Sequence, residues 1–178
     1  MKKIFLLLAV VAGMAFTSCE GDQGPPGEPG QPDGDTISEA FELRNVNFTL
    51  NNGEYSIYQT LNPPIFLDDV ILIYRLSGTI NSSTPVWQLI PRTLYVNDVD
   101  ELDYDYDFSM QDFTIYAGGN YNLAQTPQFL NNQTFRIVIV PAQLSNKMAK
   151  VDSKDFEAVK TALKLTENDF AEPKPVIR

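Results

Sequence analysis

Apolar and polar residues alternate with a period of two through most of the chain after residue 37, and this pattern predicts β-strands. The alternation is clearest at 102–108. Another alternating stretch, at 46–50, leads into Asn52 and Gly53, a pair that strongly predicts a hairpin turn. A continuous apolar run at 70–74 instead indicates a strand that is buried on both faces. Further strands are expected at 86–91, 93–96, 113–117 and 135–140.

Two places depart from simple alternation. Phe41 and Leu43 are out of phase with Val46, which predicts either a bulge near 44–45 or two separate strands. Two glycines and an asparagine at 118–120 predict a second hairpin turn. Short strands separated by turn residues are typical of an antiparallel β-sandwich, either Ig-like or jelly-roll-like.

One segment near the C-terminus changes to a helical period. Phe156, Val159 and Leu163 form a single apolar stripe. Asp152 is the expected N-cap, with Asp155 completing a capping box. A narrow stripe suits packing on a sheet, so we expect this helix to cover an open edge or end of the sandwich. A helix that binds a partner is the alternative.

The whole chain is therefore expected to be mostly β and to have one folded domain. We place the β-sandwich at 37–149 and the C-terminal helix, with an extended tail packed on the same domain, at 150–178. A signal peptide at 1–18 and a spacer at 19–36 precede this domain.

The signal peptide is predicted from the order of its parts. Lys2 and Lys3 precede an apolar stretch at 4–16, which is shorter than the roughly 20 residues of a membrane-spanning helix. The chain's only cysteine, Cys19, follows, and this arrangement resembles the bacterial lipobox, in which the cysteine is lipidated. An ordinary secretory signal followed by a free cysteine is the alternative.

The spacer is rich in glycine and proline. Glycine recurs at every third position from 21 to 30, which is the pattern of collagen. Because four such triplets are few, we expect a monomeric polyproline-II stalk. A trimer nucleated elsewhere in the chain is the alternative.

Charge and composition exclude several classes of function. Removal of residues 1–18 takes away Lys2 and Lys3 and no acid, which brings the formal net charge from −10 to −12. Such a surface repels nucleic acid and anionic lipid headgroups, so neither is an expected partner. The chain has no histidine, and its one thiol is assigned to the lipid. Ser-His-Asp and Cys-His catalysis and histidine zinc sites are therefore excluded.

The acidic stretch around residue 100 is a candidate calcium site. Asp98 and Asp100 could curl around a cation in a loop, with Asp103 at the start of the strand expected at 102–108. Neighbouring carboxylates on one face of a rigid strand are about 6.6 Å apart, which is too far for them to share one ion easily. The alternative, a solvated acidic face opposite an apolar one, is the interpretation that this spacing favours.

Aromatic residues are a second candidate for function. If their rings are exposed, they could stack on sugars or form a protein-binding patch, although aromatic residues in strands most often pack in cores. The residues concerned are Tyr55, Tyr58, Trp87, Tyr104, Tyr106, Tyr116 and Tyr121. Thr36 is a candidate for modification, because its neighbours resemble an O-glycosylation acceptor of some Gram-negative exported proteins.

Cys19 with the acidic residue after it, and the Gly-Pro-rich stretch at 21–27, resemble a group of Gram-negative exported proteins known as collagen-like lipoproteins. The segments 86–91 and 136–142 are also similar to the β-rich domain of that group. The resemblance implies a lipid anchor in the outer membrane and surface exposure. It assigns no activity to the domain.

We therefore expect a non-enzymatic envelope lipoprotein that presents a β-sandwich for binding or structural contact with a protein or glycan. The alternative is a carboxylate-dependent hydrolase of the glycosidase type. That chemistry needs no histidine, only two carboxyls about 5–5.5 Å apart for retention or about 6.5–9.5 Å apart for inversion. No cofactor is expected beyond the calcium ion considered above.

Overall fold

A computed structural model describes residues 38–81 and 83–170 of the chain. The signal peptide, the spacer, Cys19 and Thr36 all lie outside the described residues. None of the described helices is long and apolar enough to cross a membrane.

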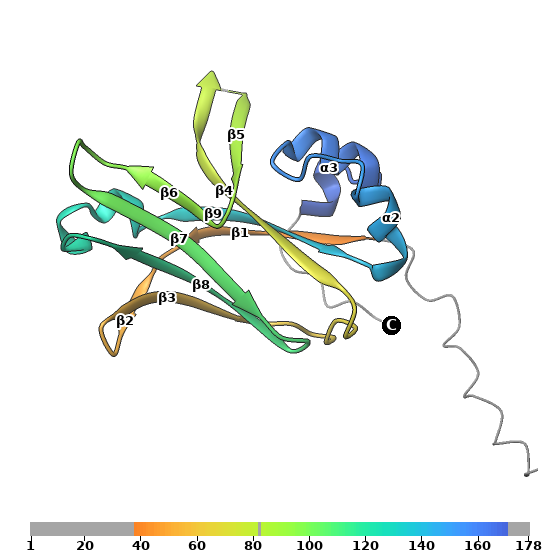
Figure 1. Ribbon diagram of the computed structural model, residues 1–178, viewed down its shortest axis with the longest axis horizontal. Helices are drawn as coiled ribbons and strands as arrows, with labels where there is room; N and C mark the ends of the chain where they lie inside the picture. Colours follow the sequence, from red (N-terminus) through yellow and green to blue (C-terminus); the bar gives the residue numbers. More distant parts are fainter. Residues whose placement is uncertain (1–37, 82, 171–178) are drawn as a thin grey trace, which may run out of the picture. The chain divides into compact units, whose positions relative to one another are not determined.

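The folded part is an antiparallel β-sandwich, as the alternation predicts (Figure 1). One sheet has four strands in the order β1-β9-β4-β5, and the other has five in the order β2-β3-β8-β7-β6. The strands are β1 (Glu39–Val46), β2 (Thr49–Asn51), β3 (Glu54–Thr60), β4 (Val70–Asn81), β5 (Thr84–Leu89), β6 (Arg92–Tyr95), β7 (Glu101–Phe108), β8 (Asp112–Gly119) and β9 (Gln133–Val140). Each sheet thus draws strands from both halves of the domain.

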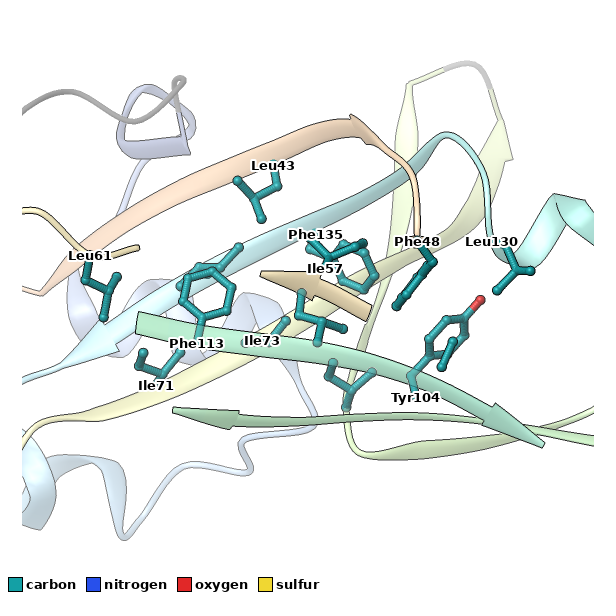
Figure 2. Close-up of a cluster of buried hydrophobic side chains, with 14 of the residues drawn as sticks. Leu43, Phe48, Ile57, Leu61, Ile71, Ile73, Tyr104, Phe113, Leu130 and Phe135 are labelled. Carbon is teal, nitrogen blue, oxygen red and sulfur yellow. The ribbon is translucent and has the colours of Figure 1, made fainter. Parts of the chain in front are cut away.

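The main core lies between the two sheets, where the inward side chains of every second strand position meet (Figure 2). Ile73 and Phe135 from the four-stranded sheet and Phe113 from the five-stranded sheet are almost completely buried. Phe48 lies between strands β1 and β2, and its ring is 5.8 Å from that of Tyr104 and 6.1 Å from that of Phe135. These aromatic contacts tie the loop to both sheets.

A second core covers the outer face of the four-stranded sheet. The outward side chains of β4 and β9, such as Tyr74 and Val138, are buried against Phe156 and Val159 of the C-terminal helix. From Ile71 to Tyr74 the strand is covered on both faces, as the continuous apolar run predicts, whereas Val70 at its start is exposed. The helical elements are η1 (Leu123–Gln125), η2 (Pro127–Phe129), η3 (Ala142–Leu144), α2 (Ser145–Met148), α3 (Phe156–Leu163) and η4 (Glu167–Phe170).

The helix differs from the expectation in two respects. It packs on a face of the sheet rather than at an edge or end, because β4 and β9 carry apolar residues on both sides. Its N-cap is Asp155, whose Oδ1 accepts a 3.0 Å hydrogen bond from the amide of Ala158. Asp152 instead accepts a hydrogen bond from the amide of Lys154 in the preceding turn. The predicted capping box is therefore wrong.

Two of the three predicted backbone irregularities are confirmed. Asn52 and Gly53 form the hairpin turn between β2 and β3, with φ angles of 52° and 90°. The register of β1 shifts between Leu43 and Val46, and Asn45 between them has a φ of 53°, so the chain bulges there.

The hairpin expected at 118–120 is wrong. β8 continues to Gly119, and the chain then passes through η1 and η2 into β9 of the other sheet. A Cβ atom on Gly119 would lie 2.6 Å from the carbonyl oxygen of Glu101. Glycine is therefore required at this position for a close approach to β7 rather than for a turn.

Candidate functional site: the bare face of the five-stranded sheet

The two outer faces of the sandwich differ in what covers them. The four-stranded sheet carries the second core and the C-terminal helices. No described helix packs across the outer face of the five-stranded sheet (Figure 1). The outward side chains of β7, Asp103, Asp105 and Asp107, are all exposed. We call this outer surface of β3, β7 and β8 the bare face.

Strand register determines which side chains meet on the bare face. Asp105 of β7 pairs with Tyr116 of β8, and Asp103 pairs with Gly118. Inward residues alternate with them, so the charged side chains of this stretch point away from the main core. The outward residues of the bare face are Glu54, Ser56, Tyr58, Thr60, Asp103, Asp105, Asp107, Asp112, Thr114, Tyr116 and Gly118.

Two tyrosines on the bare face donate hydrogen bonds to carboxylates. Tyr58, whose side chain is 62% exposed, donates from Oη to Oδ2 of Asp112 over 2.9 Å. Tyr116 donates to Oδ2 of Asp107 over 3.0 Å. These hydrogen bonds to a carboxylate raise the pKa of both phenols, because they stabilise the protonated form. Hydrogen bonds from Ser109 and then Tyr58 lower the pKa of Asp112.

A groove of about 650 Å³ opens on the bare face around Gly118. Glu54 and Asp103 stand on its two sides, on the strands that flank β8. A Cβ atom built on Gly118 would meet no atom within 4 Å, so the space above this residue is open. Asp105 and Tyr116 of the bare face also line the groove. The rest of its lining comes from residues that do not belong to the bare face, among them Leu50, Tyr55, Tyr121, Asn122 and Leu123, of which Tyr55, Tyr121 and Leu123 pack in the main core.

The charge of this sheet is strongly negative. Its five strands carry one basic residue, Arg92, against six acids, which gives a formal charge of −5. The acids are Glu54, Glu101, Asp103, Asp105, Asp107 and Asp112. Every described lysine lies between residues 147 and 164, on the helical side of the domain. Charge is therefore distributed unevenly over the sandwich.

The structure does not assemble the candidate calcium site. Within the part of the chain that it describes, no group of three or more acidic, histidine or cysteine side chains is placed to hold a metal ion. Asp100 accepts a 2.7 Å hydrogen bond from Asn97, and Asp103 accepts one from Thr93 on the neighbouring strand. The Oδ1 atom of Asn97 also accepts hydrogen bonds from the amides of Val99 and Asp100, which order the loop around Asp98.

The aromatic residues named from the sequence separate into two groups. Tyr104 is buried, and Tyr106 donates a 2.7 Å hydrogen bond to the carbonyl oxygen of Ile71 across the core. Trp87 packs in the second core on the helical side. Tyr58 and Tyr116 are the two with side chains on the bare face. Tyr95, 76% exposed on β6, was missed, although its two-residue spacing from the polar Thr93 indicates an outward side chain.

The groove lacks the arrangement that a glycosidase needs. Such an enzyme uses two carboxyls, one of them as a general acid in a water-poor pocket. The groove carboxyls Glu54, Asp103 and Asp105 are all exposed. Glu42 is a buried carboxyl, but it is paired with Arg136 under the helices of the four-stranded sheet.

Comparisons with known proteins add no further information: no family model, no curated protein and no solved structure matches this chain.

Proposed function

We propose that this protein is a lipid-anchored binding module of the cell envelope. It is held at the outer membrane through Cys19, and its bare face docks a partner. The observation that carries the proposal is the asymmetry of the sandwich. One outer face is occupied by the domain's own helices, whereas the other presents tyrosines and carboxylates around an open groove. Tyrosine is enriched at protein interfaces because its ring is apolar and its hydroxyl can still form hydrogen bonds.

The anchor is supported by the sequence around the sole cysteine. Each buried CH₂ of an acyl chain contributes about 0.8 kcal/mol to membrane binding, and two chains are enough for stable attachment. Cys19 would carry lipid after cleavage of the signal peptide, as the lipobox resemblance implies. Lipid attachment would also make a basic, headgroup-binding patch unnecessary, in agreement with the acidic charge of the chain.

Labelling with radioactive palmitate tests the anchor. Because Cys19 is the only cysteine, a Cys19→Ala variant should lose all thioether-linked label and move from the membrane fraction to the soluble fraction. A variant that retains the label, or a wild type that never acquires it, would contradict the anchor. Neither result would bear on the docking surface.

Site-specific photo-crosslinking in intact cells tests the docking surface. A photoreactive phenylalanine analogue in place of Tyr58 reports on the bare face, and the same analogue in place of Thr161 reports on the exposed side of α3. Both positions are solvent-exposed, so the substitutions are matched. We expect a discrete crosslinked product from position 58 and none from position 161. Products from both positions, or from position 161 alone, would show that the bare face is not the docking surface.

A further inference from the structure

Gly118 is flanked by two carboxylates in one row across the five-stranded sheet. Asp103 of β7 pairs directly with Gly118, and Glu54 of β3 lies opposite it on the other side, one residue along from the pair Tyr55 and Ala117. Neighbouring strands are about 4.8 Å apart, so the two carboxylates stand roughly 10 Å apart at the backbone. The position between them carries no side chain and is open to solvent.

The next residue on this face of β8 leaves that space free. Tyr116 donates its hydroxyl hydrogen bond to Asp107, which pairs with Thr114. Its side chain therefore leans along β8 away from Gly118. The ring still lines the groove and adds an aromatic surface beside the two carboxylates. A cation that entered here would meet a carboxylate on each side and a tyrosine ring along the strand.

Charge complementarity decides between the possible occupants. A neutral glycan would cover the carboxylates without compensating their charge, and desolvation of unpaired charges is costly. A second copy of this face would bring like charges together, which opposes association. The spacer of the same chain is also unsuitable, because residues 20–36 contain five acids and no base. A basic protein segment can form ion pairs with the carboxylates and pack its cationic side chains against the tyrosine rings.

We infer that the partner presents a lysine- or arginine-rich segment to the bare face, and that one of its cationic side chains enters the groove over Gly118 between Glu54 and Asp103. This inference rests on the proposed docking function. It adds the chemical class of the partner and the position at which one side chain is recognised. An ammonium or guanidinium group there would form ion pairs with both carboxylates, and Asp103 would retain its hydrogen bond from Thr93.

Binding of a defined peptide to the full chain in detergent tests the inference. The probe is a fluorescent decapeptide of alternating lysine and serine, and its anisotropy is measured at low salt. Gly118→Gln fills the groove and keeps every carboxylate. It should not disturb the fold, because Gly118 lies outside the left-handed region and its surroundings are open. Glu54→Gln with Asp103→Asn removes the two carboxylates while keeping side-chain size.

A matched control removes the same charge elsewhere. Asp68→Asn with Glu157→Gln changes two exposed acids that lie outside the bare face. We expect both groove variants to bind the peptide about fivefold more weakly than wild type, and the control variant to change binding by less than about twofold. Thermal melting of each variant confirms that it is folded. Maltohexaose, a neutral glycan, should not compete.

The possible failures are distinguishable. If Gly118→Gln binds like wild type, or if the control variant loses as much affinity as the carboxylate variant, recognition of a cation in the groove is wrong. If maltohexaose competes and the lysine peptide does not bind, the partner is a glycan and the inference also fails. The docking function itself survives either result when position 58 alone forms a crosslink, and it falls when that crosslink is absent or when position 161 forms one as well.

Discussion

Arg136 of β9 lies over the indole ring of Trp87 on β5, with 4.3 Å between its guanidinium carbon and the ring centroid. The rings of Phe156 and Phe170, at 5.2 and 4.2 Å, enclose the same cation. Glu42 of β1 accepts a 2.9 Å hydrogen bond from Nε of Arg136, and Glu167 accepts hydrogen bonds from the terminal nitrogens of the same arginine. One buried arginine therefore joins three strands to α3 and η4, which explains why the helices occupy this face of the sandwich.

Replacement of Arg136 should be among the most destabilising single changes. Arg136→Met removes the cation from three aromatic rings and two carboxylates, and it leaves Glu42 buried with only Arg44 as an ion-pair partner. Breaking a buried pair in this way typically costs about 3–5 kcal/mol of unfolding free energy, and we expect the lower end of that range here. Urea unfolding measures the loss.

The double variant Glu42→Gln with Arg136→Met is the control for that experiment. It removes the buried charge that the single variant leaves behind, so it should recover part of the lost stability. A single variant that loses less than about 1 kcal/mol would show that the helices are held mainly by apolar contacts.

Stability should depend on pH through Glu167. Hydrogen bonds from Arg136, and next from Lys160, lower the pKa of this carboxyl from 4.5 to about 2. Because the folded pKa lies below the unfolded one, its contribution is fully present above about pH 4.5 and is lost as the pH falls toward 2. Glu167→Gln should flatten the stability curve in this window, measured by urea unfolding at several pH values. The side chain is 62% exposed, so salt should weaken the effect.

The start of α3 can be tested by two matched aspartate substitutions. Asp155→Ala removes the side-chain cap of the Ala158 amide and should cost about 1 kcal/mol. Asp152→Ala removes only a hydrogen bond in the preceding turn and should cost less. Thermal unfolding of the two variants compares them directly. A larger loss for Asp152→Ala would place the N-cap where the sequence suggested it.

The end of α3 offers a stabilising change. Lys164 has a left-handed backbone, with φ 58° and ψ 31°, at a position where glycine is usual. Lys164→Gly should raise stability by about 0.5–1 kcal/mol, because glycine adopts this conformation without steric cost. Thr161→Gly, inside the same helix, should instead lower stability by about 1 kcal/mol. Equal losses in the two variants would contradict the left-handed cap.

Most of the sandwich is predictable from local pattern, whereas its contacts between elements are not. The alternation at 102–108 assigns both faces of β7 correctly, because Asp103 and Tyr104 obey the period-two rule. The position of α3 depends on which sheet face is apolar, and that is determined by strand order. The local sequence of α3 therefore cannot show whether the helix packs on a face of a sheet or at its edge.

The buried arginines show a second limit. Charged residues are rarely buried without partners, so sequence alone places Arg75 and Arg136 at the surface. In the fold, Arg75 is buried over the ring of Tyr104 at 4.7 Å and donates a 2.9 Å hydrogen bond to Gln133. These partners lie 29 and 58 residues away in the chain, and no local pattern connects them. The groove over Gly118 is equally invisible, because it requires the register of β3, β7 and β8.

If the proposed function is correct, a partner covers the bare face in the cell, and the face is open in the isolated protein. Nitration of tyrosines, read by mass spectrometry on intact cells and on the purified chain, measures this most directly, with acetylation of Lys147 on the helical side as the accessibility control. We predict that Tyr58 and Tyr116 are modified in the purified chain and protected on cells, while Lys147 is modified in both. Equal modification of the two tyrosines in both settings would contradict the claim.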